Sequence, residues 1–482
     1  MPNQALAYHR VSPRVFDLTS LRTGNVRDQL LRATLLAQGL LDEGILSSAS
    51  KLLVLGGGAA GMTVAMTAAE GGVNVTVIEK DAAPFSTLLQ ASFRRVDPTE
   101  YDWPHAHWTK GVFPFGMRSA VLPQTVGPGS ALANSFMKEF QDWTAHRAGQ
   151  MGRGKVTVRP PENADPFFAG ITDLSPKAGV DVSGPWKSAT DTTERFAVVV
   201  RCYGFGDELT SDFPPPGSWG GFSGHRFWFD NDNLSDGHLP LPKVLNGVLI
   251  SGGGDGAMQD VQRALTGWFG KELFEKLETR GRELSPTFDL QPEWLRADIL
   301  AAEDKARRAH AWKSNKGVPG ELEAWHKAIE AAVSKLVASW KMSHSNLHAL
   351  LRAVFRPEVM AKRLHVTWVV KEATPGYAYA LNRFLVLLLE ELVTASRTVT
   401  GWHIHRGYEI TSIRPPNGHK CSTPGACFGY SHTVHLKAAF PSMSPVAPKT
   451  AELILIRHGI SPSAARGRAP VPEQMVPFDL PS

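Results

Sequence analysis

Two glycine-rich turns carry the clearest chemical meaning in this chain. The first turn follows an apolar run, opens a run of small residues and comprises Gly56, Gly57, Gly58, Ala59, Ala60 and Gly61. In this G-x-G-x-x-G spacing Gly56 permits a tight turn, Gly58 lets a pyrophosphate approach the backbone, and Gly61 lets a helix pack closely on a strand. Unpaired N–H groups at the positive end of that helix hold the anion. The turn therefore predicts a dinucleotide site.

A carboxylate stands where the ribose of a dinucleotide needs an acceptor. The apolar segment 75–78 predicts a second buried strand, and Glu79 follows it, 23 residues after Gly56. A carboxylate at this place accepts hydrogen bonds from ribose hydroxyls. Strand, helix and strand within about thirty residues form a βαβ unit, which implies a parallel sheet with a right-handed crossover.

The second turn repeats this pattern after the apolar run 248–251. It comprises Gly252, Gly253, Gly254, Asp255, Gly256 and Ala257. Alanine at the third motif position holds the helix slightly away from its strand. The strand that completes this unit, 364–370, comes only after a long, charged, helical stretch at 267–363. Such an insertion is tolerated, because the entropy cost of closing a loop grows only slowly with its length.

The two units predict an α/β fold with two Rossmann-like βαβ modules and a large helical insertion in the second. An apolar stripe of leucines predicts a helix near the N-terminus. The expected organisation is an N-terminal helical extension at 1–48, a first nucleotide-binding domain at 49–240, a second at 241–460 with its insertion at 267–363, and a Pro-rich tail at 461–482.

Both turns resemble motifs of flavoproteins that bind two dinucleotides. Glu79 and Lys80, at the end of the second strand, resemble the N-terminal FAD site of these proteins, and the run 252–257 resembles the NAD(P)H motif of thioredoxin reductases and flavin-dependent N-hydroxylating monooxygenases. The resemblance implies FAD on the first module and NADPH or NADH on the second. It also implies that a buried strand from Phe196, ending in Gly204 and Gly206, closes the FAD domain.

The residue that reads the second ribose is left open by the sequence. Lys371 and Glu372 end the strand 364–370. A lysine suits the 2′-phosphate of NADPH and a glutamate suits the free 2′-hydroxyl of NADH. A further resemblance, of Arg457-His458-Gly459 to the signature of histidine phosphatases, is set aside because the tail that follows contains no histidine.

The redox partner of the flavin is less evident. The cysteines are Cys202, Cys421 and Cys427, and they offer no C-x-x-C or C-x4-C pair for a thiol relay. His105 and His107 lie among aromatic residues just after the first module and are the candidate catalytic residues. We expect the tryptophans beside them to pack in the protein interior, and the alternative is that they line a flavin ring or a planar substrate. No metal site is predicted.

Composition excludes several classes. The formal net charge of +5 is too dilute for nucleic acid, and no run of five basic residues occurs. No stretch is long enough to span a bilayer and no signal peptide is found, so a cytoplasmic protein is expected. The resemblance implies an FAD-dependent oxidoreductase in which NAD(P)H reduces the flavin. We favour a monooxygenase of a small molecule; the alternatives are a flavin reductase or oxidase, or a cofactor-bound interaction protein. A homo-oligomer is left open.

Overall fold

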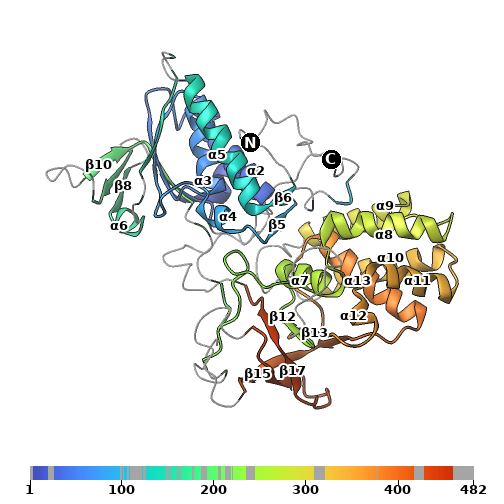
Figure 1. Ribbon diagram of the computed structural model, residues 1–482. Helices are drawn as coiled ribbons and strands as arrows, with labels where there is room; N and C mark the ends of the chain where they lie inside the picture. The colour runs from blue at the N-terminus through green and yellow to red at the C-terminus, as the bar shows by residue number, and fades with distance from the viewer. Residues whose placement is uncertain are drawn as a thin grey trace. The chain divides into compact units, whose positions relative to one another are not determined.

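The computed structural model describes most of the chain (Figure 1). The described residues are 4–19, 26–97, 100, 103–105, 108, 122, 126–147, 150, 153–159, 161, 164–175, 179–185, 193–202, 204, 208–211, 219, 221–234, 245–308, 321–376, 378–416 and 428–459.

The chain divides into two compact units. The described part of the first unit lies within Met1–Pro98 and Lys110–Asp207, and the second comprises Thr99–Thr109 and Glu208–Ser461. The short segment 99–109 thus belongs to the second unit, although it follows the first module in sequence. The domain boundary expected at 240/241 remains a prediction; the longer of the two segments that form the second unit begins at Glu208.

A six-stranded sheet forms the centre of the first unit, in the order β1-β2-β11-β3-β4-β7. The βαβ unit predicted around the first turn is present: β3 and β4 pair in parallel, with α3 between them in the chain. The strands are β1 (Arg10–Ser12), β2 (Val15–Asp17), β3 (Lys51–Leu55), β4 (Asn74–Ile78), β7 (Val156–Arg159) and β11 (Val198–Arg201).

The helices and smaller strands of this unit surround the sheet (Figure 1). The helices are α1 (Gln4–His9), α2 (Val26–Asp42), α3 (Ala59–Glu70), α4 (Ser86–Gln90), α5 (Gly129–Arg147) and α6 (Asp165–Ala169). A three-stranded antiparallel sheet contains β8 (Ile171–Ser175), β9 (Gly179–Ser183) and β10 (Thr193–Phe196). The last pair is β5 (Arg95–Val96) and β6 (Gly127–Pro128).

The N-terminal extension contributes more than the helix expected of it. Its helix is α2, which packs against α3, but β2 also pairs in parallel with β11 and so extends the sheet of the first module. The single strand expected from Phe196 is interrupted as well. Ala197 separates β10 from β11, and these two strands belong to different sheets.

The second unit contains a parallel four-stranded sheet in the order β14-β13-β12-β18. Its strands are β12 (Gly247–Ser251), β13 (His365–Val370), β14 (Trp402–Arg406) and β18 (Leu453–Ile456). The helix after the second turn is α7 (Asp255–Thr266). The predicted insertion before β13 is helical: it contains α8 (Gly270–Leu284), α9 (Glu293–Arg308), α10 (Glu321–Ser339), α11 (His344–Val354) and α12 (Pro357–Met360). Fold class and insertion are therefore as the sequence predicts.

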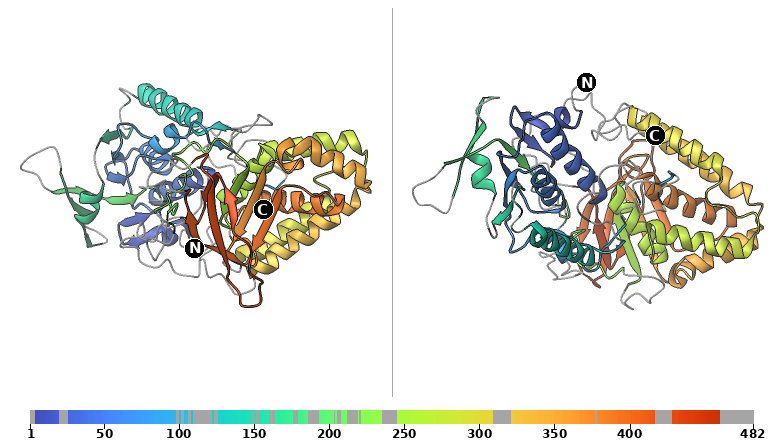
Figure 2. Two further views of the ribbon diagram at one scale, coloured as in Figure 1. Left: turned by 60° about the horizontal axis from the view of Figure 1, so that its bottom comes forward. Right: turned by 90° about the horizontal axis from the view of Figure 1, so that it is seen from above.

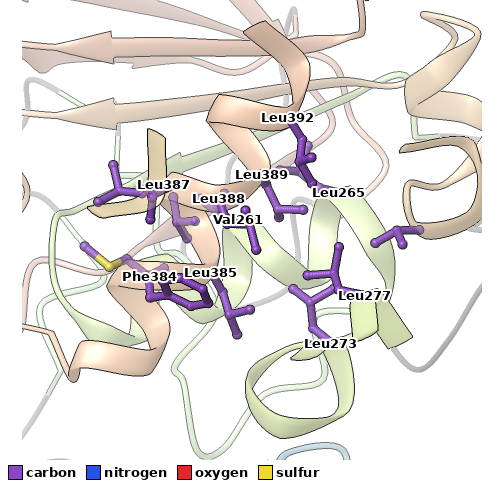
Figure 3. Close-up of a cluster of buried hydrophobic side chains, with 14 of the residues drawn as sticks. Val261, Leu265, Leu273, Leu277, Phe384, Leu385, Leu387, Leu388, Leu389 and Leu392 are labelled. Atoms are coloured by element: carbon purple, nitrogen blue, oxygen red, sulfur yellow. The ribbon is translucent and has the colours of Figure 1, made fainter. Parts of the chain in front are cut away.

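Helices cover one face of this sheet, as Figures 1 and 2 show. The helix α13 (Ala380–Ser396) is buried in the middle of them, and its leucines pack against Val261 and Leu265 of α7 and Leu273 and Leu277 of α8 (Figure 3). Sheet residues such as Val248 and Ile250 complete this core. Because α13 is apolar nearly all round, it is an interior helix.

A second sheet covers the opposite face. It is antiparallel, in the order β15-β16-β17, and its strands are β15 (Tyr408–Arg414), β16 (His432–Ala438) and β17 (Lys449–Ala451). Leu249 and Val369 of the parallel sheet share a core with Val434 and Ala451 of this sheet. Among the helices of the described residues, none is long and apolar enough to cross a bilayer.

Candidate functional site

The first glycine turn has the backbone that its spacing predicts. Gly56 has a φ of +107°, which a glycine adopts readily. A Cβ added to Gly61 would lie 1.9 Å from the carbonyl oxygen of Gly56, so only glycine allows α3 to approach β3 this closely. A Cβ added to Gly58 would meet nothing within 4 Å. The space in front of Gly58 is therefore open.

The N-terminus of α3 faces that open space without a cap. Its N-cap residue is Gly58, no side chain accepts a hydrogen bond from the first turn, and that turn contains no acidic residue. The first N–H groups of a helix have no partner within the helix and carry a partial positive charge. This end of α3 therefore fits the diphosphate of a dinucleotide.

Glu79 lies directly beside the turn. Its Oε2 accepts from the amide of Gly57 at 2.6 Å and its Oε1 accepts from the amide of Asp81 at 2.9 Å. The residue is 5% exposed. Burial raises the pKa of its carboxyl, and the two amides act against that rise. Because each carboxylate oxygen has a second lone pair, the group can still accept from a ribose hydroxyl.

The other residues predicted for this site are less constrained. Lys80 is exposed. Gly204 has a φ of +76° and open space where a Cβ would stand, which fits the close approach of a ligand. Gly206 lies outside the described residues. The roles of these three residues remain predictions.

The second turn has the same backbone form. Gly252 has a φ of +139°, and Gly254 caps α7 without a side-chain hydrogen bond. A Cβ added to Gly253 would lie 2.7 Å from the amide nitrogen of Gly376 and 3.2 Å from Val370. A Cβ added to Gly256 would touch Phe227. The loop after β13 therefore lies closely against this turn.

Strand register identifies the counterpart of Glu79 in the second module. Leu55 pairs with Ile78, so the next residues, Gly56 and Glu79, lie at one level. Ser251 pairs with Val369, so Gly252 lies level with Val370. Val370 thus has the place in the second module that Glu79 has in the first, and its side chain has no hydrogen-bond acceptor.

The two residues named for this role from the sequence lie further along. The ammonium of Lys371 is 2.7 Å from the carboxylate of Glu409, and both residues are at least partly exposed. Glu372 accepts a hydrogen bond at its carbonyl from the amide of Gly407. Lys371 is adjacent to the ribose-reading place, and its ion pair holds it at the surface.

Asp255 distinguishes the second turn from the first. It begins α7, and its Oδ1 accepts from the amide of Tyr379 at 2.7 Å and from the side chain of Asn382 at 3.0 Å. Burial raises its pKa to about 6, although both hydrogen bonds and Arg383 act in the opposite direction. The carboxylate therefore ties the start of α13 to the start of α7. Its negative charge also stands beside the amides predicted to bind a diphosphate.

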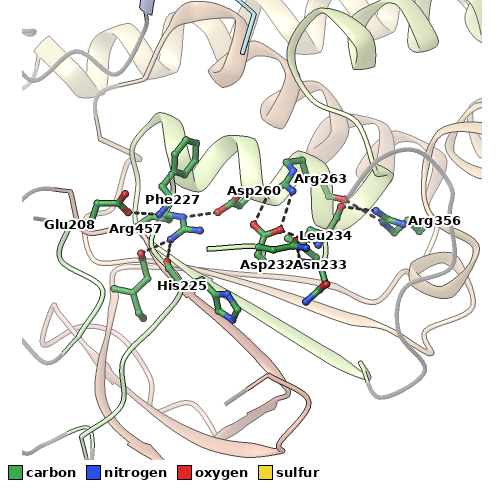
Figure 4. A network of polar contacts seen from close by, with 12 residues as sticks. Glu208, His225, Phe227, Asp232, Asn233, Leu234, Asp260, Arg263, Arg356 and Arg457 are labelled. Carbon is green, nitrogen blue, oxygen red and sulfur yellow. Dashed lines mark hydrogen bonds and ion pairs between the residues drawn. The ribbon is translucent and has the colours of Figure 1, made fainter. Parts of the chain in front are cut away.

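A buried charge network holds the end of β18 against α7 (Figure 4). Arg457 donates to Asp260 at 2.7 Å and to the carbonyl oxygen of His225 at 2.6 Å. Arg263 donates to Asp260 at 3.0 Å and to Asp232 at 2.8 Å. Because Arg457 follows β18 and α7 follows the second turn, this network fixes the carboxyl edge of the sheet.

The aromatic group beside the candidate histidines belongs to the core of the second unit. Trp103 packs on Phe384 with ring centres 4.6 Å apart, and Trp108 packs edge-on against Phe274 at 5.2 Å. With its amide oxygen turned toward the indoles, Gln291 accepts from both indole nitrogens, at 3.2 and 3.0 Å. The tryptophans therefore have the packing role that the sequence favours.

The candidate catalytic histidines are only partly described. His105 is half-buried, and its carbonyl oxygen accepts from the amide of Trp108 at 3.1 Å. His107 lies outside the described residues. Catalysis by either remains a prediction.

Thiol chemistry has one described candidate. Cys202 is buried directly after β11, and burial raises the pKa of its thiol well above the ordinary value. A thiol with a raised pKa is a poor nucleophile at neutral pH. Cys421 and Cys427 lie outside the described residues. Among the residues that are described, no group of three or more metal-ligating side chains occurs.

Comparison with protein families assigns the first turn. Residues 51–92 match the model of a family described as FAD binding domain. The match contains the turn, α3, β4 and Glu79, which are the parts found above to fit a dinucleotide. It confirms the flavoprotein resemblance at the first module and supports FAD as its ligand. No curated protein gives a significant match.

Solved structures are similar to this chain only at a distance. Thioredoxin reductase from Lactococcus lactis has 11% identity and a TM-score of 0.38, with 85% of this chain and 78% of that one covered. Thioredoxin reductase from T. acidophilum has 12% identity and a TM-score of 0.36, with the same coverage. A flavin monooxygenase from Stenotrophomonas maltophilia has 14% identity and a TM-score of 0.30 over 44% of this chain and 54% of that one.

Proposed function

We propose that the protein is an FAD-dependent oxidoreductase whose flavin is reduced by NADPH or NADH. The observation that carries the proposal is the first glycine turn, with its uncapped helix, the open space before Gly58 and the carboxylate of Glu79 beside it. FAD, when bound, would accept two electrons as a hydride and pass the electrons on to a substrate or to O₂.

The residues of the first module bind and orient that cofactor. The amides at the start of α3 hold the diphosphate, and Gly58 lets it approach the backbone. Glu79 accepts from the ribose and stays in place because the amides of Gly57 and Asp81 hold it. These contacts would hold the diphosphate and ribose of the cofactor.

The second module is proposed to bind the nicotinamide nucleotide. The positive φ of Gly252 and the uncapped start of α7 at Gly254 support this role. Val370 offers the 2′-hydroxyl of NADH no acceptor, and Lys371 next to it carries a positive charge. We therefore propose NADPH as the preferred donor, since an adjacent cation suits a 2′-phosphate.

For the fate of the electrons we propose monooxygenation of a small molecule. Burial raises the pKa of the Cys202 thiol, and Cys421 and Cys427 have neither C-x-x-C nor C-x4-C spacing, which disfavours a thiol relay. Turnover distinguishes the alternatives: hydroxylated product equal to the NADPH consumed supports a monooxygenase, whereas peroxide without product supports an oxidase. A bound flavin that neither nucleotide reduces would support an interaction protein.

The test is the absorption spectrum of the purified protein under nitrogen. We expect a yellow protein that bleaches when NADPH is added, and bleaches more slowly with NADH. A protein that cannot be reconstituted with FAD would overturn the proposal. The variant Gly58→Ala is the matched control, because its added methyl group fills the open space while leaving the fold intact.

A further inference from the structure

A cavity of about 260 Å³ opens at the amino ends of the parallel strands of the second unit. It lies at the edge of the sheet opposite the second glycine turn, because parallel strands place all their amino ends together. The dinucleotide proposed above therefore has no part in it. The lining residues are Asn246, Gly247, His365, Thr367, His403, Pro448, Lys449, Thr450 and Glu452.

Two histidines of adjacent strands form a hydrogen-bonded pair in this cavity. Nδ1 of His365 lies 3.1 Å from Nε2 of His403, and the ring planes differ by only 16°. The ring centres are 5.4 Å apart. This separation equals the 3.1 Å between the two nitrogens plus about one ring radius on each side, as expected when the bonded nitrogens lie between the ring centres. The rings therefore meet edge to edge, and one nitrogen donates to the other. A metal ion is disfavoured, because the two nitrogens point at each other rather than at a common centre.

Strand register directs a lysine toward the same cavity. Lys449 pairs with Val434, whose side chain is buried between the two sheets. Directly opposed residues of an antiparallel pair point to the same face, so Lys449 starts on the inner face of β17. Among the residues that the structure describes, no carboxylate forms an ion pair with Lys449.

The carboxylate in the lining is already stabilised. Oε2 of Glu452 accepts from the amides of Asn246 at 3.0 Å and Gly247 at 2.6 Å, and the residue is 7% exposed. The other polar side chains of the lining are those of Asn246, Thr367 and Thr450. Hydrogen-bond donors and side chains that can carry a positive charge therefore predominate around the cavity.

We propose that this cavity binds an oxyanion, namely the phosphate or carboxylate group of a small molecule, through Lys449 and the His365–His403 pair. Lys449 supplies the fixed charge, and the histidine pair becomes a charged donor when it takes up one proton. The hydroxyl of Thr367, on the face of β13 that His365 shares, adds a donor for the oxygens of the anion.

Binding is coupled to protonation. Burial lowers the pKa of His403, and His365 and Lys449 lower it further. His405 lies two residues after His403, on the same face of β14. Burial lowers the pKa of His405 to about 4, and Lys449 and His403 contribute to this decrease. An anion among these groups favours their charged forms, so it raises these pKa values and binds more tightly as the pH falls. If binding takes up one proton, the affinity for the anion rises by at most about tenfold for each unit by which the pH falls.

The experiment follows the imidazole NMR signals of the full-length protein during titration with inorganic sulfate, inorganic phosphate or acetate. His365→Gln and His403→Gln assign the signals. We expect saturable shifts at both histidines and a rise in the pKa of His403. Sulfate and phosphate exceeding acetate would identify a phosphate site, and the reverse order a carboxylate site.

Matched lysine variants test the charge. Lys449→Met should weaken binding at least about tenfold, and Lys449→Arg should restore most of it. Lys437→Met should leave binding unchanged, because Lys437 is exposed on the opposite face of the neighbouring strand β16. Binding that is unaffected by Lys449→Met, or shifts absent with all three anions, would overturn the proposal. So would saturable binding of Zn²⁺ that requires both histidines.

Discussion

The carboxylate of Glu79 accepts a hydrogen bond from the amide of Gly57 over 2.6 Å, and this contact joins the end of β4 to the turn after β3. Glu79→Gln removes the negative charge from the ribose contact. It also replaces one carboxylate oxygen by an amide nitrogen, which cannot accept a hydrogen bond from the amide of Gly57 or Asp81. Loss of one charge-assisted hydrogen bond costs about 1.5–3 kcal/mol, so FAD affinity should fall by about 10- to 100-fold. Fluorescence titration with FAD measures this. Glu194→Gln, in an exposed ion pair with Lys51, should bind FAD normally.

Alanine at Gly58 and at Gly61 should have opposite consequences. Gly61→Ala places a methyl group 1.9 Å from the oxygen of Gly56, and such overpacking costs about 1–3 kcal/mol of stability. Gly58→Ala meets no neighbour within 4 Å and has a φ of −71°, so the apoprotein should keep its unfolding midpoint and lose FAD. Denaturant unfolding and flavin content distinguish the two. Equal stability of both apoproteins would contradict the geometry.

Removal of Arg263 should strongly destabilise the second unit. Arg263→Met leaves the buried carboxylates of Asp232 and Asp260 without this cation, and breaking a buried pair in this way costs about 3–5 kcal/mol. Urea unfolding measures the loss. Arg282→Met breaks an exposed pair with Glu278 on α8, and it should change the unfolding free energy by less than about 1 kcal/mol.

Asp255 should make the stability of the second unit depend on pH. Burial raises its folded pKa from 3.8 to about 6, so the folded state holds the proton more tightly than the unfolded state. The resulting stabilisation is complete below about pH 4 and is lost as the pH rises through about 6. Asp255→Asn should remove this dependence and be at least as stable as the native protein near neutral pH. A difference in unfolding free energy between Asp255→Asn and the native protein that does not change with pH would contradict the raised pKa of Asp255.

Lys371 should set the preference between nicotinamide nucleotides. Lys371→Ala removes the cation next to Val370, so KM for NADPH should rise by about tenfold while KM for NADH changes little. Glu409→Gln frees Lys371 from its 2.7 Å ion pair and should lower KM for NADPH or leave it unchanged. Steady-state kinetics with both nucleotides measure the ratio. Equal effects of Lys371→Ala on the two nucleotides would exclude this role.

Local pattern was a good guide wherever one segment decides its own structure. The glycine spacing at 56–61, the strand at 74–78 and the helices of the insertion follow from periodicity and residue type alone. Short elements were not predictable in this way. The strand β2 has three residues and exists because it pairs with β11, far along the chain.

Register and packing decided the rest of the candidate site. The sequence left Lys371 and Glu372 open for the second ribose, and the pairing of Ser251 with Val369 shows that Val370 has the place that Glu79 has in the first module. The sequence favoured packing for Trp103 and Trp108 without excluding a ligand-lining role, and their burial against Phe384 and Phe274 shows that they pack in the second unit.

The sequence by itself determined that this chain contains two strand–glycine–helix modules, because a tight turn and a close helix depend on residues that are adjacent in the chain. Only the tertiary structure decided which side chains stand beside those turns, and it alone brought His365, His403 and Lys449 to one cavity. Such contacts join residues far apart in sequence, so they depend on strand register and sheet packing, which no local pattern specifies.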